Sequence, residues 1–181
     1  MDNTDFHDPY EFPISWDVFH LNTVKLAEKL MAKGPFKGIV AITRGGLIPA
    51  SIIARELNIR VIESVGMKSY TDGRQRGSLR ILKEMNRDLV GDGEGWLVVD
   101  DLVDSGVTAK AVKELIPKAH MATVYAKPEG QQQTDTFVVP VRQDVWLIFP
   151  WDARVVRVDP LIMLQDNLEK VERSTHKEGE V

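Results

Sequence analysis

The chain of 181 residues contains no cysteine. Disulfide bridges, thiolate zinc sites and cysteine nucleophiles are therefore excluded, and any catalysis must use other side chains. The 27 acidic and 23 basic residues leave a formal net charge of −4. Broad binding of nucleic acid depends on a basic surface, so this charge argues against it.

A basic N-terminal stretch and long apolar runs are also missing. The chain begins MDNTDFHDPYEF, which has several acidic side chains and no Lys or Arg. A signal peptide begins with a basic stretch followed by an apolar one, so this N-terminus does not fit one. No apolar run approaches the roughly 20 residues that a membrane-spanning helix needs. The default expectation is a cytoplasmic enzyme or binding protein with no integral membrane segment.

Short apolar runs alternate with helical patterns along most of the chain. Residues 38–43 form a short, continuous apolar run, which is typical of strands buried on both faces of a parallel sheet, and residues 96–99 and 120–126 are expected to be further strands. The alternation predicts an α/β fold, an open and mostly parallel sheet with flanking helices. One helix is expected to begin at Ser15 and to end near Lys33, with an apolar stripe of Val18, Leu21, Leu26, Leu30 and Met31.

The predicted domain organisation is simple. Residues 1–14 are expected to form an acidic, loosely structured arm, residues 15–160 a single domain, and residues 161–181 a C-terminal helix and tail. The length fits one domain with a real core.

Two segments of the domain differ from the rest. The polar, glycine-containing segment at about 68–90 is long enough to be a functional flap or an extra hairpin. Two short apolar runs, 137–139 and 145–148, are expected to be strands of a small hood lobe at about 127–155.

The most informative stretch is LVVDDLVDSGVT at residues 97–108. An apolar strand ends in adjacent aspartates, at the end of the sheet where ligands bind in open α/β folds. A five-residue turn then leads into a helix near Thr108, and the N–H groups at a helix N-terminus attract phosphate. Ser105 and Thr108 add hydroxyl donors, and Gly106 lets the backbone come close.

The carboxylates of Asp100, Asp101 and Asp104 would repel a plain phosphate. They fit the site if they face hydroxyl groups and a metal ion, so the expected ligand is a sugar phosphate. The alternative is a solvated acidic cluster with a helix cap, which would be favoured for a lone aspartate. The whole string, in a strand–turn–helix context, favours the binding site.

Residues 98–108 resemble the motif of type I phosphoribosyltransferases that binds 5-phosphoribosyl-1-pyrophosphate (PRPP). Over roughly residues 14–158 the chain is similar to the bacterial xanthine-guanine phosphoribosyltransferases, because several separate motifs agree in order. These motifs are TRGGLIP at 43–49, IAREL at 53–57, GDGEG at 91–95, PKAH at 117–120, AKP at 126–128 and PWD at 150–152.

The resemblance implies a purine salvage enzyme that transfers the phosphoribosyl group of PRPP to N9 of a 6-oxopurine, xanthine or guanine, with Mg²⁺. It implies that Asp104 is the catalytic base beside purine N7, and that Asp101 and Asp152 position the metal. It also implies a non-proline cis peptide in the Arg44-Gly45 loop, which would meet pyrophosphate. The implied PRPP-binding residues are Arg44, Gly45, Arg76 (in the flap), Asp100, Asp101, Asp104, Ser105, Gly106, Val107 and Thr108.

Base recognition would fall to the hood. By resemblance Lys127 donates to the purine 6-oxygen, Trp146 stacks on the ring, and the backbone of Leu147 reads position 2. An ammonium donor at Lys127 disfavours adenine, whose exocyclic amine is also a donor. Taken singly, a strand-end lysine or a tryptophan in an apolar run is more often a packing or surface residue.

The resemblance further implies a homo-oligomer, a tetramer, that is cytoplasmic with peripheral contact at the inner membrane face. Two rival functions stay open. One is a hypoxanthine-guanine preference, since Lys127 does not select the substituent at position 2. The other is a non-catalytic PRPP sensor that binds nucleic acid, against which stand the negative charge and the complete set of carboxylates.

Overall fold

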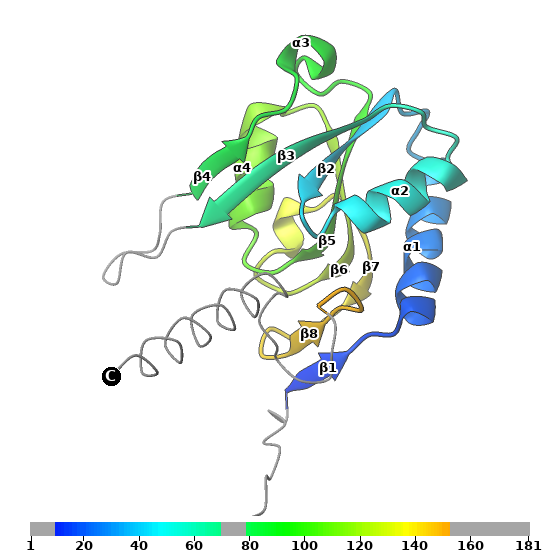
Figure 1. Cartoon of the computed structure of the whole chain (residues 1–181), viewed down its shortest axis with the longest axis vertical. Helices are drawn as coiled ribbons and strands as arrows, with labels where there is room; N and C mark the ends of the chain where they lie inside the picture. Colours follow the sequence, from blue (N-terminus) through cyan, green and yellow to red (C-terminus); the bar gives the residue numbers. More distant parts are fainter. Residues whose placement is uncertain (1–9, 70–78, 153–181) are drawn as a thin grey trace, which may run out of the picture.

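The computed structural model describes residues 10–69 and 79–152, which form a six-stranded sheet with helices on both faces (Figure 1). The strand order is β4-β3-β2-β5-β6-β7, and every neighbouring pair is parallel except β3 and β4. The predicted α/β fold is therefore confirmed. The strands are β2 (Gly38–Thr43), β3 (Ile62–Ser69), β4 (Leu79–Lys83), β5 (Trp96–Val103), β6 (His120–Ala126) and β7 (Thr136–Pro140).

The central strands are apolar along their length because both of their faces are covered. In β2, Ile39 and Ala41 belong to one buried cluster, whereas Val40 and Ile42 belong to the other. Successive side chains of a strand point to opposite faces, so a strand between two helical layers needs apolar residues at every position.

Three helices supply these layers. α1 (Trp16–Met31) and α2 (Leu47–Glu56) cover one face of the sheet, and α4 (Val107–Leu115) covers the other (Figure 1). A short helix, α3 (Arg87–Val90), and a 3₁₀ turn, η1 (Gln131–Gln133), lie in connections. None of the helices within residues 10–69 and 79–152 is long and apolar enough to cross a membrane.

Helix α1 begins as predicted but buries a different face. The Ser15 hydroxyl accepts the N–H of Val18 at 3.3 Å and caps the helix. The predicted stripe is correct for Leu26 and Leu30 and wrong for three others, which are largely exposed: Val18 (48%), Leu21 (55%) and Met31 (72%). The face that carries Phe19 is buried instead, because the Phe19 ring packs against Tyr125, Phe149 and Trp151. The buried residues are Phe19, Thr23, Leu26, Ala27 and Leu30.

A second, two-stranded sheet consists of β1 (Glu11–Pro13) and β8 (Trp146–Ile148), which run parallel. The expectation of a loosely structured arm is wrong for residues 11–13, which form β1. The hood strand at 145–148 is confirmed as β8, but the assignment of 137–139 to the same lobe is wrong, since β7 pairs with β6 in the main sheet. A three-residue strand needs a partner for its backbone groups, and the N-terminal segment provides one. The domain boundaries stay a prediction, and residues 153–181 lie outside the described part.

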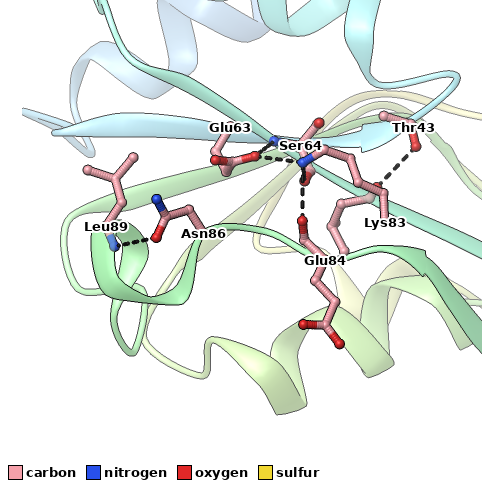
Figure 2. Close-up of polar contacts among 8 residues, drawn as sticks. Thr43, Glu63, Ser64, Lys83, Glu84, Asn86 and Leu89 are labelled. Atoms are coloured by element: carbon pink, nitrogen blue, oxygen red, sulfur yellow. Dashed lines mark hydrogen bonds and ion pairs between the residues drawn. The ribbon is translucent and has the colours of Figure 1, made fainter.

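The polar segment after β3 contains a hairpin. Strand β4 pairs antiparallel with β3, with a shift of register between Gly66 and Met67. At the base of this hairpin Lys83 donates to Glu63 Oε1 (2.8 Å) and to the carbonyl oxygens of Ser64 (2.7 Å) and Glu84 (3.1 Å), as Figure 2 shows. One ammonium group thus fastens the edge strand to its neighbour. Residues 70–78, between the two strands, lie outside the described part.

Candidate active site

The carboxyl ends of β2 and β5 lie side by side in the middle of the sheet. The chain order reverses here, because β3 lies on one side of β2 and β5 lies on the other. In open α/β sheets such a switch point opens a crevice in which ligands bind. The sequence motif at residues 43–49 begins at the last residue of β2. The motif at residues 97–108 covers most of β5 and the turn that follows it.

The turn from β5 into α4 forms a hollow suited to an anion. Because β5 continues to Val103, the turn has three residues, 104–106, rather than the expected five. Gly106 has φ 79°, a left-handed conformation that favours glycine, and it begins α4 without a side-chain cap. The hollow, of about 120 Å³, is lined by Asp100 and residues 102–109. On this measure a single water needs only about 10–15 Å³, so a phosphate-sized group fits at this helix N-terminus.

Asp100 and Asp101 lie in the last part of β5 and are poorly solvated. Burial raises the pKa of Asp100 well above its ordinary value, and the charge of Asp101 raises it further. Burial likewise raises the pKa of Asp101, and the charge of Asp152 adds to the effect. Two adjacent carboxyls held in this way favour a cation or hydroxyl donors as partners.

The loop after β2 packs directly against this pair. A Cβ atom added to Gly45 would overlap the carboxylate of Asp101, so only glycine lets the loop lie this close. The peptide bond between Thr43 and Arg44 is cis, which confirms the expected non-proline cis peptide. The Arg44 side chain is exposed. The structure therefore brings an arginine loop and two carboxyls to one edge of the sheet.

Asp104 and Lys127 form an ion pair at the same edge. The Lys127 Nζ atom lies 3.0 Å from Asp104 Oδ2, and the lysine side chain is only 5% exposed against 48% for the aspartate. A buried ammonium requires a hydrogen-bonding partner of opposite charge. The alternative that Lys127 is an ordinary surface lysine is therefore wrong.

The hood strand β8 presents a ring and a stretch of backbone. The Trp146 side chain is 63% exposed, whereas Leu147 is buried. Trp146 N–H donates to the Tyr10 carbonyl, and Ile14 N–H donates to the Ile148 carbonyl, both at 2.9 Å. Since backbone groups alternate in direction along a strand, the N–H and C=O of Leu147 point away from β1.

Asp152 follows the hood and is held by aromatic packing and its own turn. Its Oδ2 accepts the N–H of Phe149 at 3.1 Å. Trp151 stacks on Phe149 at 4.7 Å between ring centroids and meets Phe19 of α1 edge-on at 4.8 Å. The charge of Asp152 contributes to the raised pKa of Asp101, more weakly than burial does, so the two carboxylates lie within electrostatic reach of one another.

Comparison with known protein families identifies the family of this chain. The family model "Phosphoribosyl transferase domain" matches residues 22–159. The chain belongs to the phosphoribosyltransferase family.

Two relatives of this phosphoribosyltransferase bear the name xanthine-guanine phosphoribosyltransferase. The protein of Desulfotalea psychrophila is 54% identical over 151 residues, which are 83% of this chain and 92% of that protein. The protein of Nitratidesulfovibrio vulgaris strain DP4 is 50% identical over 151 residues, 83% of this chain and 90% of that protein. Among solved structures, a purine phosphoribosyltransferase from Pyrococcus horikoshii superposes with a TM-score of 0.69 at 27% identity, covering 83% of this chain and 99% of that one.

Two residues beside the candidate site of this phosphoribosyltransferase were not predicted from the sequence, and one predicted residue cannot be placed. The expected flap arginine, Arg76, is outside the described residues. Gln143 was missed, although its Nε2 donates to Asp104 Oδ1 at 2.8 Å. Gly130 was also missed, although a Cβ there would overlap the Asp104 carbonyl oxygen. No local pattern distinguishes these two residues, because their role depends on a neighbour distant in sequence.

The donor set also permits a test of the expected magnesium. Within residues 10–69 and 79–152, no three side chains of His, Asp or Glu gather as a preformed metal site. Magnesium commonly takes only one or two carboxylates and completes its shell with water and substrate oxygens. The poorly solvated Asp101, with Asp152 acting on it, fits that requirement.

Proposed function

We propose that this chain transfers the 5-phosphoribosyl group of PRPP to N9 of a 6-oxopurine, xanthine or guanine, and releases pyrophosphate. The observation that carries the proposal is the end of β5, where two half-buried, poorly solvated carboxyls are followed by a short turn and an uncapped helix N-terminus. One feature suits sugar hydroxyls and the other suits a phosphate. The relatives named xanthine-guanine phosphoribosyltransferase, at about 50% identity, support the choice of purine.

In this proposal PRPP spans the crevice. Its 5-phosphate lies in the hollow formed by Asp104, Ser105, Gly106, Val107 and Thr108, and its ribose hydroxyls meet Asp100 and Asp101. Arg44 and Gly45 meet the pyrophosphate, which is the leaving group. The half-buried Thr108 and the exposed Ser105 at the rim of the hollow support the phosphate assignment.

Magnesium would be held by Asp101 and Asp152 together with substrate oxygens. When bound, it would neutralise charge on the pyrophosphate and so assist its departure. Arg44 adds positive charge on the same leaving group. Arg76 of the flap is proposed to exclude water there, since hydrolysis of PRPP is the competing reaction.

The purine would lie between the hood and the turn after β5. Trp146 offers an uncovered ring for stacking, and the outward-facing backbone of Leu147 offers a donor and an acceptor to position 2 of the purine. Lys127 would donate to the 6-oxygen. Its buried stem keeps the ammonium group beside the turn after β5, near the proposed place of the 6-oxygen, which supports a role in specificity.

The proposed reaction needs one base. As the bond from ribose C1 to pyrophosphate breaks, positive charge develops on the ribose and N9 attacks C1. The proton on N7 passes to Asp104, whose Oδ2 already lies 3.0 Å from the ammonium that would bind the adjacent 6-oxygen. Most of the acceleration is expected from positioning and electrostatics.

One assay tests the proposal. Protein, PRPP and Mg²⁺ are mixed separately with xanthine, guanine, hypoxanthine or adenine, and nucleotide and pyrophosphate are measured. Formation of xanthine or guanine nucleotide with equal release of pyrophosphate is expected, with little reaction of adenine. Preference for hypoxanthine would assign the alternative substrate, because Lys127 contacts only the 6-oxo group that these bases share. No pyrophosphate with any base would contradict the proposal.

The assembly and location of the protein stay predictions. A tetramer is tested by light scattering of the purified chain at several concentrations. The cytoplasmic location and the peripheral contact with the inner membrane face are tested by fractionation of cells at low and high salt.

A further inference from the structure

Gln143 joins three segments around the proposed catalytic base. It lies in the loop between β7 and β8, and its Nε2 donates to Asp104 Oδ1 at 2.8 Å. Its Oε1 accepts the backbone N–H of Glu129, in the turn after β6, at 3.2 Å. One amide therefore ties the hood loop and the turn after Lys127 to the phosphate turn.

The orientation of this amide is determined by its two partners. If nitrogen and oxygen were exchanged, the oxygen would face the Asp104 carboxylate and the NH₂ would face the N–H of Glu129. Both contacts would then oppose like groups. The Glu129 N–H thus fixes the amide so that it can only donate to Asp104.

The two oxygens of Asp104 have different partners. Oδ2 faces Lys127 and Oδ1 faces Gln143. If Lys127 turns to the 6-oxygen of a bound purine, as the proposed function requires, Oδ2 loses that partner and becomes available to the N7 proton. Oδ1 keeps its hydrogen bond to Gln143, which would hold the carboxylate at the correct angle.

We propose that Gln143 is a positioning residue that orients Asp104 for proton transfer from the purine. The inference rests on the proposed function and adds to it a residue that acts through the base. Gln143 also lies three residues before Trp146, so the loop that would orient the base leads directly into the strand whose tryptophan would stack the purine. The neighbouring charged residues, Arg142 and Asp144, pair with each other instead.

The first experiment compares two variants with a control in the same loop. Gln143→Met keeps the length of the side chain and removes the donor. Gln143→Glu keeps an acceptor for Glu129 N–H but places a carboxylate against Asp104. We expect kcat with guanine to fall about tenfold for Gln143→Met and further for Gln143→Glu, with KM for PRPP within about twofold of wild type. Arg142→Met, which removes the charge of a 74% exposed side chain in the same loop, should keep the wild-type kcat.

A double-mutant cycle separates positioning from a structural role. In an Asp104→Asn background, which has no base to orient, Gln143→Met should change kcat less than about twofold. An equal loss in both backgrounds would overturn the inference, as would a folded Gln143→Met or Gln143→Glu protein with wild-type kcat. If wild type itself forms no nucleotide, the proposed function fails and the inference fails with it; an active wild type with unaffected variants overturns the inference alone.

Discussion

At the scale of single residues, much of the proposed chemistry depends on how charges are paired. Lys127 is almost wholly buried and relies on Asp104 as its counter-charge. Asp100 and Asp101 show the opposite condition, since two carboxyls lie together in a poorly solvated place. A site prepared for a sugar and a cation is therefore expected to cost stability in the free protein.

The proposed role of Asp104 predicts a split between turnover and binding. Asp104→Asn keeps the shape of the side chain but removes the base, so kcat should fall about 100-fold or more, within the range for loss of a general base. Affinity for PRPP should fall much less. Steady-state kinetics and calorimetric titration with PRPP measure the two quantities. Equal losses would reduce Asp104 to a structural part of the phosphate turn.

The crowded carboxyls predict that one substitution has opposite effects on stability and function. Asp100→Asn removes one of two adjacent, half-buried acids, and the raised pKa of Asp100 reflects the cost of keeping both charged. The melting temperature at pH 7.5 should rise by about 2 °C or more, while KM for PRPP should rise about tenfold because a ribose-hydroxyl acceptor is lost. Thermal unfolding and initial rates test this. A lower melting temperature would show that the acid pair does not strain the fold.

At the scale of elements, one lysine links the two strands of the edge hairpin at its base. The carboxylate of Glu63 and the carbonyl oxygen of Ser64, both in β3, accept from Lys83 and join β4 to β3 near the point where the register shifts (Figure 2). The proposed flap arginine, Arg76, lies in sequence between these two strands.

This arrangement predicts a stability term that depends on pH. The hydrogen bond from Lys83 holds the pKa of Glu63 below its ordinary value of 4.5. The contribution is therefore complete above about pH 4.5 and is lost as the pH falls through the folded-state pKa. Lys83→Met should lower the free energy of unfolding at pH 7 by no more than about 1 kcal/mol, because Lys83 is half exposed and solvent screens the pair.

The measurement is urea unfolding of wild type and Lys83→Met at pH 7 and again near pH 3.5. Lys118→Met serves as the comparison, because Lys118 is an exposed lysine that pairs with Asp92 elsewhere on the surface. The difference between wild type and Lys83→Met should shrink at the lower pH. A difference that is the same at both pH values would mean that the lysine acts through the carbonyl oxygens alone.

At the scale of the whole molecule, the hood joins the two ends of the described chain. Strand β8, with Trp146 and Leu147, has β1 as its partner in the two-stranded sheet. The proposed base-binding backbone is thus positioned by residues more than 130 positions earlier in the sequence. The proposed stacking and backbone contacts to the purine therefore come from a different sheet than the proposed contacts to PRPP.

Removal of β1 should separate these two functions. A chain shortened by residues 1–13 loses the partner of β8, so KM for guanine should rise at least about tenfold while KM for PRPP changes about twofold or less. The comparison is a chain shortened by residues 1–9, which keeps β1. Equal KM values for guanine in the two shortened chains would show that β8 holds its place without β1.

The sequence by itself determined the central parallel strands, the presence of the flanking helices and the acidic turn after β5. Continuous apolar runs at β2, β5 and β6 predict buried parallel strands, and an acidic pair before a glycine turn predicts a site at the strand ends. These signals are local, because strand burial and helix N-termini are encoded within about ten residues. The resemblance of the motifs to the phosphoribosyltransferases then supplied the family.

Tertiary structure alone decided which elements meet. The pairing of β7 with the main sheet, the pairing of β1 with β8, the buried face of α1 and the contact of Gln143 with Asp104 all join segments that are far apart in sequence. Periodicity reports that a strand or an apolar face exists, but not which edge or cluster it joins, because that depends on the backbone groups and apolar surfaces left open by the rest of the fold. For Gln143, a single polar residue in a loop, the carboxylate of Asp104 gives it a role that no pattern in its own neighbourhood encodes.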